Sequence, residues 1–115
     1  MIIGMGIDIV ELQRIESAVV KQPRFAERIL TKKELDKYLT LSVIRKIEYL
    51  SGRFAAKEAF VKATNQSYGW HDIEVLNDGN GRPYITAEVN GRIHISISHS
   101  KNYAISQVII ESLSS

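Results

Sequence analysis

Residues 2–9 alternate between large apolar side chains and small or acidic ones. The apolar set is Ile3, Met5, Ile7 and Ile9, and the opposite set is Gly4, Gly6 and Asp8. Because a period of two is typical of a β-strand, the pattern predicts a strand over these residues. The glycine-bearing face is nearly bare, so another backbone or a ligand can approach it closely.

The pattern changes to the period of a helix at Ile9, and helices are expected through the first half of the chain. The first apolar stripe consists of Ile9, Leu12, Ile15 and Val19. Pro23 is expected in the first turn of a second helix, whose apolar residues are Phe25, Ile29 and Leu30. Thr31 and Glu34 have the spacing of a capping box, which predicts a short third helix through Tyr38.

The longest helical pattern runs from about Ser42 to Thr64. Its apolar stripe consists of Ile44, Ile47, Leu50, Phe54 and Val61. The stripe predicts one long helix that buries a single face. Gly52 weakens this prediction slightly, since a glycine inside a helix costs about 1 kcal/mol relative to alanine.

The second half of the chain has the signals of β-strands. We expect strands at residues 72–76, 84–89, 92–98 and 103–111, with a turn at Asn77–Gly81. Asn90-Gly91 predicts a hairpin between the second and third of these strands. The sequence therefore predicts an α+β fold in a single domain over residues 1–115, with an N-terminal strand, helices and an antiparallel β-meander.

Composition narrows the class of protein. Hydrophobic residues make up 44% of the chain and charged residues 24%, which is ordinary for a globular protein. There is no cysteine, which excludes disulfides and thiolate metal sites. The chain shows neither a signal-peptide pattern nor an apolar run of membrane-spanning length, so we expect a cytoplasmic protein that binds no membrane.

The net charge of +2 is too small to indicate a nucleic-acid binder, so we expect no nucleic-acid partner. The positive charges are nevertheless concentrated near the N-terminus. They are Arg14, Lys21, Arg24, Arg28, Lys32 and Lys33, interrupted by Glu16 and Glu27. Such a segment could attract an acidic partner protein.

The stretch GRFAAKEAFVKA, residues 52–63, holds the first candidate for chemistry. Glu58 and Lys62 have the i,i+4 spacing of a solvated ion pair on an exposed helix, which is the commoner meaning of this pattern. Phe54 lies one turn before Glu58, and Ala55 and Ala59 are expected to clear space beside it. That arrangement suits a carboxylate and an ammonium that face a hard cation and a phosphate.

Asp8 also has two interpretations. It could cap the helix expected to begin at Ile9, a position that aspartate favours. It could instead be the second carboxylate of a magnesium site with Glu58, because Mg²⁺ favours one or two protein carboxylates, water and phosphate oxygens. Spacing along the chain leaves both interpretations open.

The segment His94–Ser100 does not have the pattern of a hydrolase. Ser98 and His99 would point to opposite faces of a strand, and the chain has no Gly-x-Ser-x-Gly elbow. The three histidines lie at positions 71, 94 and 99, without cysteines or a His-Glu-x-x-His motif, so a zinc site is not expected. The serines are either ordinary residues of a polar sheet face or donors toward a phosphate or a nucleoside.

Five segments together resemble the holo-acyl-carrier-protein synthases, the small bacterial 4′-phosphopantetheinyl transferases. They are Gly6-Ile-Asp-Ile-Val-Glu11 with Arg14, Arg24–Thr31 with Glu34, Gly52–Phe60 with Lys62-Ala63, Asp72-Ile-Glu-Val75, and Ile95-Ser-Ile-Ser-His99. The resemblance covers almost the whole chain, and Arg-Phe-Ala-Ala-Lys-Glu-Ala is its most specific motif. It implies the 4′-phosphopantetheinyl transferase fold.

The resemblance implies a reaction and roles for residues at matching positions. Enzymes of this family move the 4′-phosphopantetheine arm of coenzyme A onto a serine of apo acyl carrier protein and release adenosine 3′,5′-bisphosphate, which supports fatty acid biosynthesis. Asp8 and Glu58 would hold Mg²⁺, and Lys62 would act with them in catalysis and contact the phosphates. The residues expected to bind the nucleotide end of coenzyme A are Arg45, Arg53, Lys62 and His99.

The resemblance also implies protein partners. The family docks acyl carrier protein on a basic and apolar surface, and forms homotrimers with active sites between subunits. The matching docking residues are Arg14, Lys21, Arg24, Phe25 and Arg28; a solvated helix face is the alternative for them.

One segment departs from the family. After Lys62-Ala63 the family usually continues Leu/Phe-Gly-Thr-Gly, whereas this chain continues Thr64-Asn-Gln-Ser-Tyr-Gly-Trp70 and is shorter here. The family's loop contacts with coenzyme A are therefore not expected in this chain.

Two other hypotheses for the function stay open from the sequence. The chain could be a basic module that binds an acidic protein or RNA without chemistry, or a family member without activity.

Overall fold

Helices and strands occupy separate parts of the chain in the computed structural model, which describes residues 1–114. The elements in order are β1 (Ile2–Glu11), α1 (Leu12–Lys21), α2 (Phe25–Ile29), α3 (Lys32–Tyr38), α4 (Val43–Thr64), the 3₁₀ turn η1 (Trp70–Asp72), β2 (Glu74–Asn77), β3 (Pro83–Thr86), β4 (Arg92–His99) and β5 (Tyr103–Glu111). The expected α+β class is confirmed. Within residues 1–114, none of the helices is both long enough and apolar enough to cross a bilayer.

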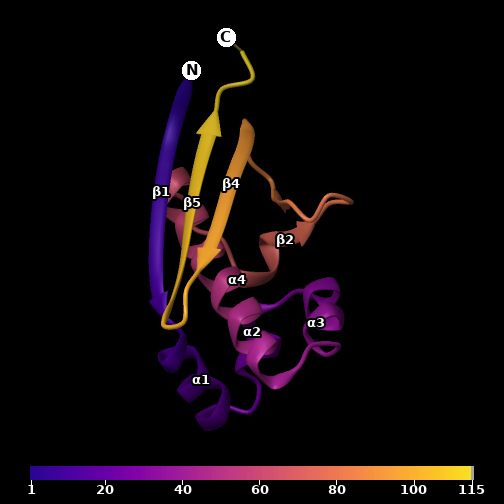
Figure 1. Cartoon of the computed structure of the whole chain (residues 1–115). Helices are drawn as coiled ribbons and strands as arrows, with labels where there is room; N and C mark the ends of the chain where they lie inside the picture. Colours follow the sequence, from indigo (N-terminus) through magenta and orange to yellow (C-terminus); the bar gives the residue numbers. More distant parts are fainter. Residues whose placement is uncertain (115) are drawn as a thin grey trace.

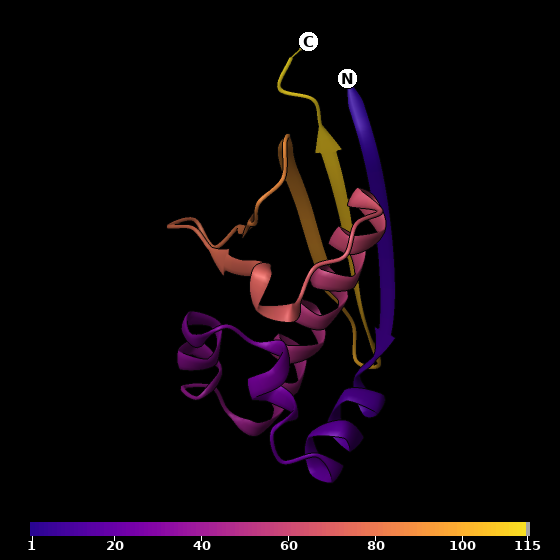
Figure 2. The same ribbon diagram turned by 180° about the vertical axis from the view of Figure 1, so that it is seen from behind.

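The main sheet has three antiparallel strands in the order β1-β5-β4. Helix α4 packs along one face of this sheet, and α1, α2 and α3 gather beyond one end of it (Figure 1). The view from behind shows α4 crossing in front of the strands (Figure 2). No helix of residues 1–114 covers the opposite face, which stays open to solvent.

The open face is apolar along β1 and polar along β4. The β1 side chains on it are each more than half exposed: Ile3, Met5, Ile7 and Ile9. On β4 the expected alternation is confirmed, because Ile93, Ile95 and Ile97 are partly buried on the α4 side while His94, Ser96 and Ser98 are exposed. A strand edge with this many exposed apolar residues is a candidate for contact with another chain.

The predicted hairpin at Asn90-Gly91 is wrong. Strand β3 is short and pairs with β2 in a separate two-stranded sheet around the Asn77–Gly81 turn, while β4 pairs with β5. A Cβ at Gly91 would lie 2.8 Å from Ile110 Cγ2 and 3.0 Å from the Glu111 carbonyl oxygen. The glycine thus permits a close approach to β5 rather than a turn between β3 and β4.

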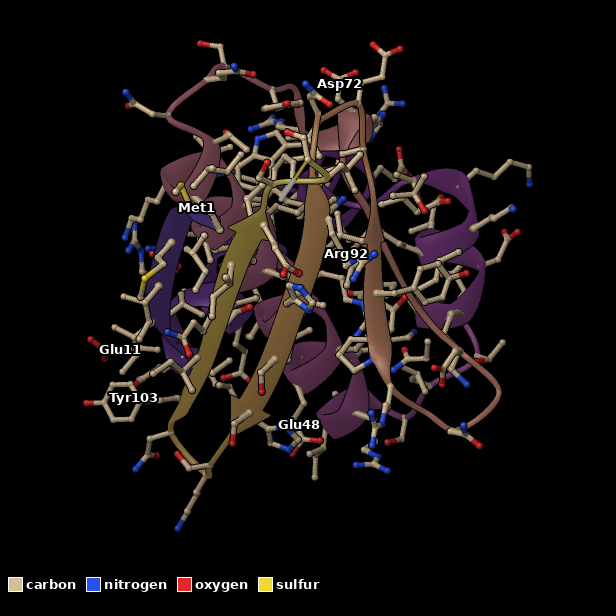
Figure 3. The ribbon with its side chains drawn as sticks, turned by 90° about the horizontal axis from the view of Figure 1, so that it is seen from above. Met1, Glu11, Glu48, Asp72, Arg92 and Tyr103 are labelled. Atoms are coloured by element: carbon tan, nitrogen blue, oxygen red, sulfur yellow. The ribbon has the colours of Figure 1, made fainter. Side chains whose placement is uncertain are left out.

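Two helix starts differ from the prediction. β1 continues past Ile9 to Glu11, because its pairing with β5 continues to the Glu11–Tyr103 pair (Figure 3), and α1 begins only at Leu12. Asp8 therefore lies inside a strand, and its interpretation as a helix cap is wrong. Pro23 lies in the turn before α2 instead of in its first helical turn, since Arg24 is the N-cap.

The long helix is confirmed as α4, with the Ser42 side chain accepting a hydrogen bond from the Arg45 amide at its start. Its buried face differs in part from the predicted stripe, because Ile44 is exposed. Small side chains make up much of the buried face instead: Ser51, Gly52, Ala55, Ala56, Ala59 and Ala63. Their size lets the neighbouring strands approach the helix axis closely.

A buried ion pair joins α4 to α3. Lys57 Nζ lies 2.7 Å from Glu34 Oε1, and both side chains are fully buried. The ammonium also donates to the carbonyl oxygens of Ile29, at 2.7 Å, and Trp70, at 3.0 Å. Burial lowers the pKa of Lys57, and the adjacent Glu34 carboxylate opposes that shift.

The Glu34 carboxylate has several further partners. Oε1 accepts from the Thr31 amide at 2.8 Å and Oε2 from the Val75 amide at 2.6 Å. The first of these bonds completes the expected capping box of α3, because Thr31 Oγ1 accepts from the Glu34 amide. One pair of charges therefore joins α2, α3, η1 and β2 to α4, with its polar atoms hydrogen-bonded.

We expect Lys57→Met to destabilise the protein by about 3–5 kcal/mol, because it leaves the Glu34 carboxylate buried without its cation. The double variant Lys57→Met/Glu34→Gln should recover part of that loss, since it removes both charges. Urea unfolding at a fixed protein concentration measures both. Lys32→Met, which breaks the exposed Lys32–Asp36 pair, is the control and should cost less than about 0.5 kcal/mol. A Lys57→Met protein as stable as this control would contradict the interpretation.

Candidate active site

Two glycines allow β1 to lie directly against α4. A Cβ at Gly4 would lie 2.0 Å from the Ala63 carbonyl oxygen, and one at Gly6 would lie 2.0 Å from the Ala59 carbonyl oxygen. No side chain fits at such distances, so positions 4 and 6 must both be glycine for β1 to pack against α4 in this way. Asp8 follows on the same face of β1, which brings its carboxylate to α4.

Ala59 serves this contact and does not clear space for a ligand. Both Ala55 and Ala59 have no exposed surface and belong to the core. The expectation that they leave room for a bulky molecule beside Glu58 is therefore wrong. Their small size lets neighbouring elements approach α4.

Asp8, Glu58 and Lys62 come together where β1 meets α4. Lys62 Nζ lies 3.2 Å from Asp8 Oδ1 and donates to the Ile7 carbonyl oxygen at 3.0 Å. Within residues 1–114, the carboxylate that Lys62 pairs with is Asp8 on the strand, and not Glu58 on its own helix. The simple i,i+4 ion pair considered from the sequence is therefore not what forms.

The two carboxylates lie within electrostatic range of each other. Partial burial raises the pKa of the Glu58 carboxyl, and the negative charge of Asp8 raises it further. Lys62 and Arg14 oppose the rise. A carboxyl whose pKa is raised by a neighbouring carboxylate lies at a site that favours a cation.

The donor set fits magnesium rather than a metal held entirely by protein. Within residues 1–114, no cluster of three or more histidine, cysteine or acidic side chains could hold a metal ion. Two carboxylates are nevertheless the number that Mg²⁺ commonly takes from a protein, with water and phosphate oxygens as its other ligands. The geometry is thus compatible with a cation that binds together with a phosphate compound.

A pocket beside α4 gathers three of the four residues expected to bind a nucleotide, while the fourth, Lys62, does not line it. The pocket has a volume of about 280 Å³, and its lining includes Arg45, Arg53 and His99. Glu48 lies between two of them, 3.4 Å from Arg45 Nη1 and 3.5 Å from His99 Nε2. Figure 3 shows Glu48 beside the C-terminal end of β4, where His99 is the last residue.

Arg53 is held more tightly than the other two. Its guanidinium donates to the Val75 carbonyl oxygen at 3.2 Å and to Asn77 Oδ1 at 2.6 Å, and it stacks 4.0 Å above the Tyr49 ring. Burial lowers the pKa of Arg53. These contacts give Arg53 a structural role in joining α4 to β2, whatever it binds in the pocket.

Comparison with known proteins assigns the family. The model of the 4′-phosphopantetheinyl transferase superfamily matches residues 4–108. The chain belongs to that superfamily. The resemblance to holo-acyl-carrier-protein synthases and the expected class of enzyme, a phosphopantetheinyl transferase, are thereby confirmed.

Individual relatives agree with this assignment. Holo-[acyl-carrier-protein] synthases from Halalkalibacterium halodurans and Bacillus subtilis are 57% and 54% identical to the chain, and each match covers 100% of both sequences. The crystal structure of a holo-(acyl-carrier-protein) synthase from Bacillus anthracis in complex with CoA (3′,5′-ADP) superposes with a TM-score of 0.92 at 46% identity. That match covers 97% of this chain and 98% of that one.

The residues matched to the transferase docking surface lie on α1 and α2 and in the turn between them. Arg14 and Lys21 are exposed on α1. Arg24 and Arg28 line a groove with Glu27, Leu30, Lys32, Leu35 and His71, and Arg24 Nε lies 3.2 Å from Glu27 Oε2. Phe25 differs from them, because it is partly buried and its ring stacks 6.4 Å from that of Phe54. The positive charge of Arg14 lowers the pKa of the Glu58 carboxyl, so Arg14 lies near that carboxyl. The basic surface of α1 and α2 therefore adjoins the site of Asp8 and Glu58.

The segment that departs from the other transferases follows α4 directly. Asn65 ends the helix in the left-handed conformation, with φ of 54°. Tyr68 then packs edge-on against Phe60 and donates to the Glu88 carbonyl oxygen at 2.7 Å. The shorter segment is thus packed against the core and the 87–91 connection.

Sequence reasoning missed Glu48 and the Glu34–Lys57 pair. Glu48 follows Arg45 at i,i+3 spacing, which indicates an ion pair on the helix but gives no sign of His99. Glu34 was recognised only as a helix cap. In both cases the partner lies on a distant element, and no spacing along the chain reveals it.

Proposed function

We propose that this chain, as one domain over residues 1–115, transfers the 4′-phosphopantetheine arm of coenzyme A to a serine of apo acyl carrier protein and releases adenosine 3′,5′-bisphosphate. The observation that carries the proposal is the meeting of Asp8, Glu58 and Lys62 at the junction of β1 and α4. The relatives named synthases of holo-acyl-carrier-protein support this substrate pair. The activity would belong to the cytoplasm and to fatty acid biosynthesis.

The proposed chemistry needs positioning and charge neutralisation more than covalent help. Asp8 and Glu58 would hold Mg²⁺, which when bound supplies positive charge to the pyrophosphate and favours ionisation of the attacking hydroxyl. The Lys62 side chain is about half exposed, so its ammonium can reach a phosphate and stabilise charge on the departing bisphosphate.

We propose that the nucleotide end of coenzyme A occupies the pocket lined by Arg45, Arg53 and His99. Arg45 and His99 share Glu48, so each can leave it for a phosphate at little cost. Arg53 would mainly form the wall, because its guanidinium already bonds β2. The Bacillus anthracis relative is described in complex with CoA (3′,5′-ADP), which supports a coenzyme A site in this fold.

The basic residues of α1 and α2 are the proposed docking surface for acyl carrier protein. Arg14, Lys21, Arg24 and Arg28 are exposed and would attract an acidic partner, and Phe25 would add apolar contact. Arg14 lies nearest the carboxylates and would bring the acceptor serine close to them.

We also propose a homotrimer in which the open sheet face of one subunit contacts the next. The supporting observation is the row of exposed apolar side chains on β1, continued on β5 by Tyr103 and Ile105. Large apolar patches of this kind are typical of surfaces that associate. Because Asp8 lies on β1, the active site would then border the contact.

Incubation with coenzyme A, Mg²⁺ and apo acyl carrier protein should add the mass of phosphopantetheine to the carrier, measured by mass spectrometry. Glu58→Gln should lower turnover by about 100-fold or more, because one of two metal-binding carboxylates is lost. Glu88→Gln, on an exposed segment, is the control and should match the wild type. If the wild-type protein adds no mass to acyl carrier protein while an active relative does so in the same assay, the chain would be a binding protein without catalytic activity.

Arg14→Glu should raise the KM for acyl carrier protein by about tenfold or more and leave the affinity for coenzyme A unchanged. Steady-state kinetics with each substrate varied in turn measures the two effects. The defect should shrink as salt is added, since it is electrostatic. An unchanged KM for the carrier would remove Arg14 from the docking surface.

Sedimentation equilibrium should give a mass close to three times the 13.0 kDa of one chain. Ile7→Lys should shift this mass toward that of a monomer, because a charge would be buried at the contact. Val20→Lys, at an exposed apolar site on α1, is the control and should leave the mass unchanged. If neither variant dissociates the assembly, the contact between subunits lies on a different surface from the open sheet face.

A further inference from the structure

Lys62 crosses from α4 to β1 to reach its acidic partner. Its helical neighbour Glu58 has the favourable i,i+4 spacing, yet the ammonium lies 3.2 Å from Asp8 Oδ1 and 3.0 Å from the Ile7 carbonyl oxygen. Two of the three N–H donors of the ammonium can thus be used by β1. While both bonds hold, the ammonium has only one donor left for a phosphate.

The two lysines of this stretch differ in how easily a competitor can displace them. Lys57 and Glu34 are both completely buried, so their pair is permanent. Lys62 is 54% exposed, while the Asp8 side chain is 16% exposed. An ion pair with one partner so accessible to water contributes little stability, about 0–1 kcal/mol, and is screened by salt. A divalent cation can therefore compete for the Asp8 oxygen.

We propose that Lys62 acts as an internal counter-ion that occupies Asp8 Oδ1 and must release it before Asp8 can bind a divalent cation. The inference rests on the proposed role of Asp8 and Glu58 as metal ligands. Lys62 keeps the acidic pair partly neutralised, and its release gives Asp8 to the metal and the ammonium to the phosphates. Metal binding and the phosphate contact of Lys62 are coupled by this exchange.

The exchange predicts that removal of Lys62 tightens metal binding even though it impairs catalysis. Lys62→Met keeps an unbranched side chain of nearly the same length and removes the ammonium. We expect it to strengthen Mn²⁺ binding about two- to fivefold in the absence of coenzyme A, measured by electron paramagnetic resonance of free Mn²⁺. The size follows from the loss of one weakly stabilising ion pair that competes with the metal.

A general effect of positive charge is separated from the contact by a matched variant. Arg14→Met removes a charge that acts on Glu58 without a bond to Asp8, and should change Mn²⁺ affinity less than twofold. If Arg14→Met tightens binding as much as Lys62→Met, the proposed exchange is wrong. Asp8→Asn should abolish the binding in every background.

These variants distinguish two kinds of failure. If the wild type binds Mn²⁺ through Asp8 but Lys62→Met binds no more tightly, the exchange is overturned and the metal site stands. If Asp8→Asn binds as well as the wild type, the metal site and the exchange are both overturned.

A second readout follows the wild-type protein itself, and variants serve only to assign the signal and to provide a metal-free reference. The ¹⁵N resonance of the Lys62 ammonium, identified by its loss in Lys62→Met or by through-bond assignment, should move when Mg²⁺ is added. It should move in the same direction in Asp8→Asn without metal, because both changes release the ammonium. If the ¹⁵N chemical shift of the Lys62 ammonium does not change at saturating Mg²⁺, the proposed exchange is wrong.

Discussion

The buried pair of Glu34 and Lys57 is the interaction on which the rest of the structure depends. Lys57 holds the end of α2, the start of α3 and η1 against α4, and Glu34 adds β2 through the Val75 amide. Successive residues on a helix point about 100° apart, so turning Lys57 into the core fixes the direction of Glu58 next to it. The permanent ion pair thus orients the catalytic candidate without touching it.

The glycines of β1 supply the other half of that geometry. Gly4 and Gly6 let the strand lie against the backbone of α4, so Asp8 arrives at the helix turn that carries Glu58. The alternation that points these small residues inward also points Ile3, Met5 and Ile7 outward. Exposed apolar residues on β1 are therefore a consequence of building the site on this strand, and association would cover them.

The sequence predicted features that depend on neighbouring residues and missed those that depend on distant ones. The Thr31–Glu34 capping box, the span of α4 and the strand at 103–111 are local patterns, and all three formed. Asn90-Gly91 is an exception, because its local hairpin signal lost to two other local pairings: β3 pairs with β2, and β4 pairs with β5 across residues 100–102. The Asp8–Lys62 contact joins residues 54 positions apart and overrides the i,i+4 preference of Lys62 for Glu58.

The same contact limits how a cation can bind. Two carboxylates, one of them already paired with an ammonium, offer a divalent ion few ligands and little net negative charge. A phosphate compound adds oxygen ligands for the cation and a partner for the released Lys62, so both exchanges become favourable together. On the proposed exchange, such a site would hold a cation firmly only when a phosphate compound is present, which suits an enzyme whose substrate supplies a pyrophosphate.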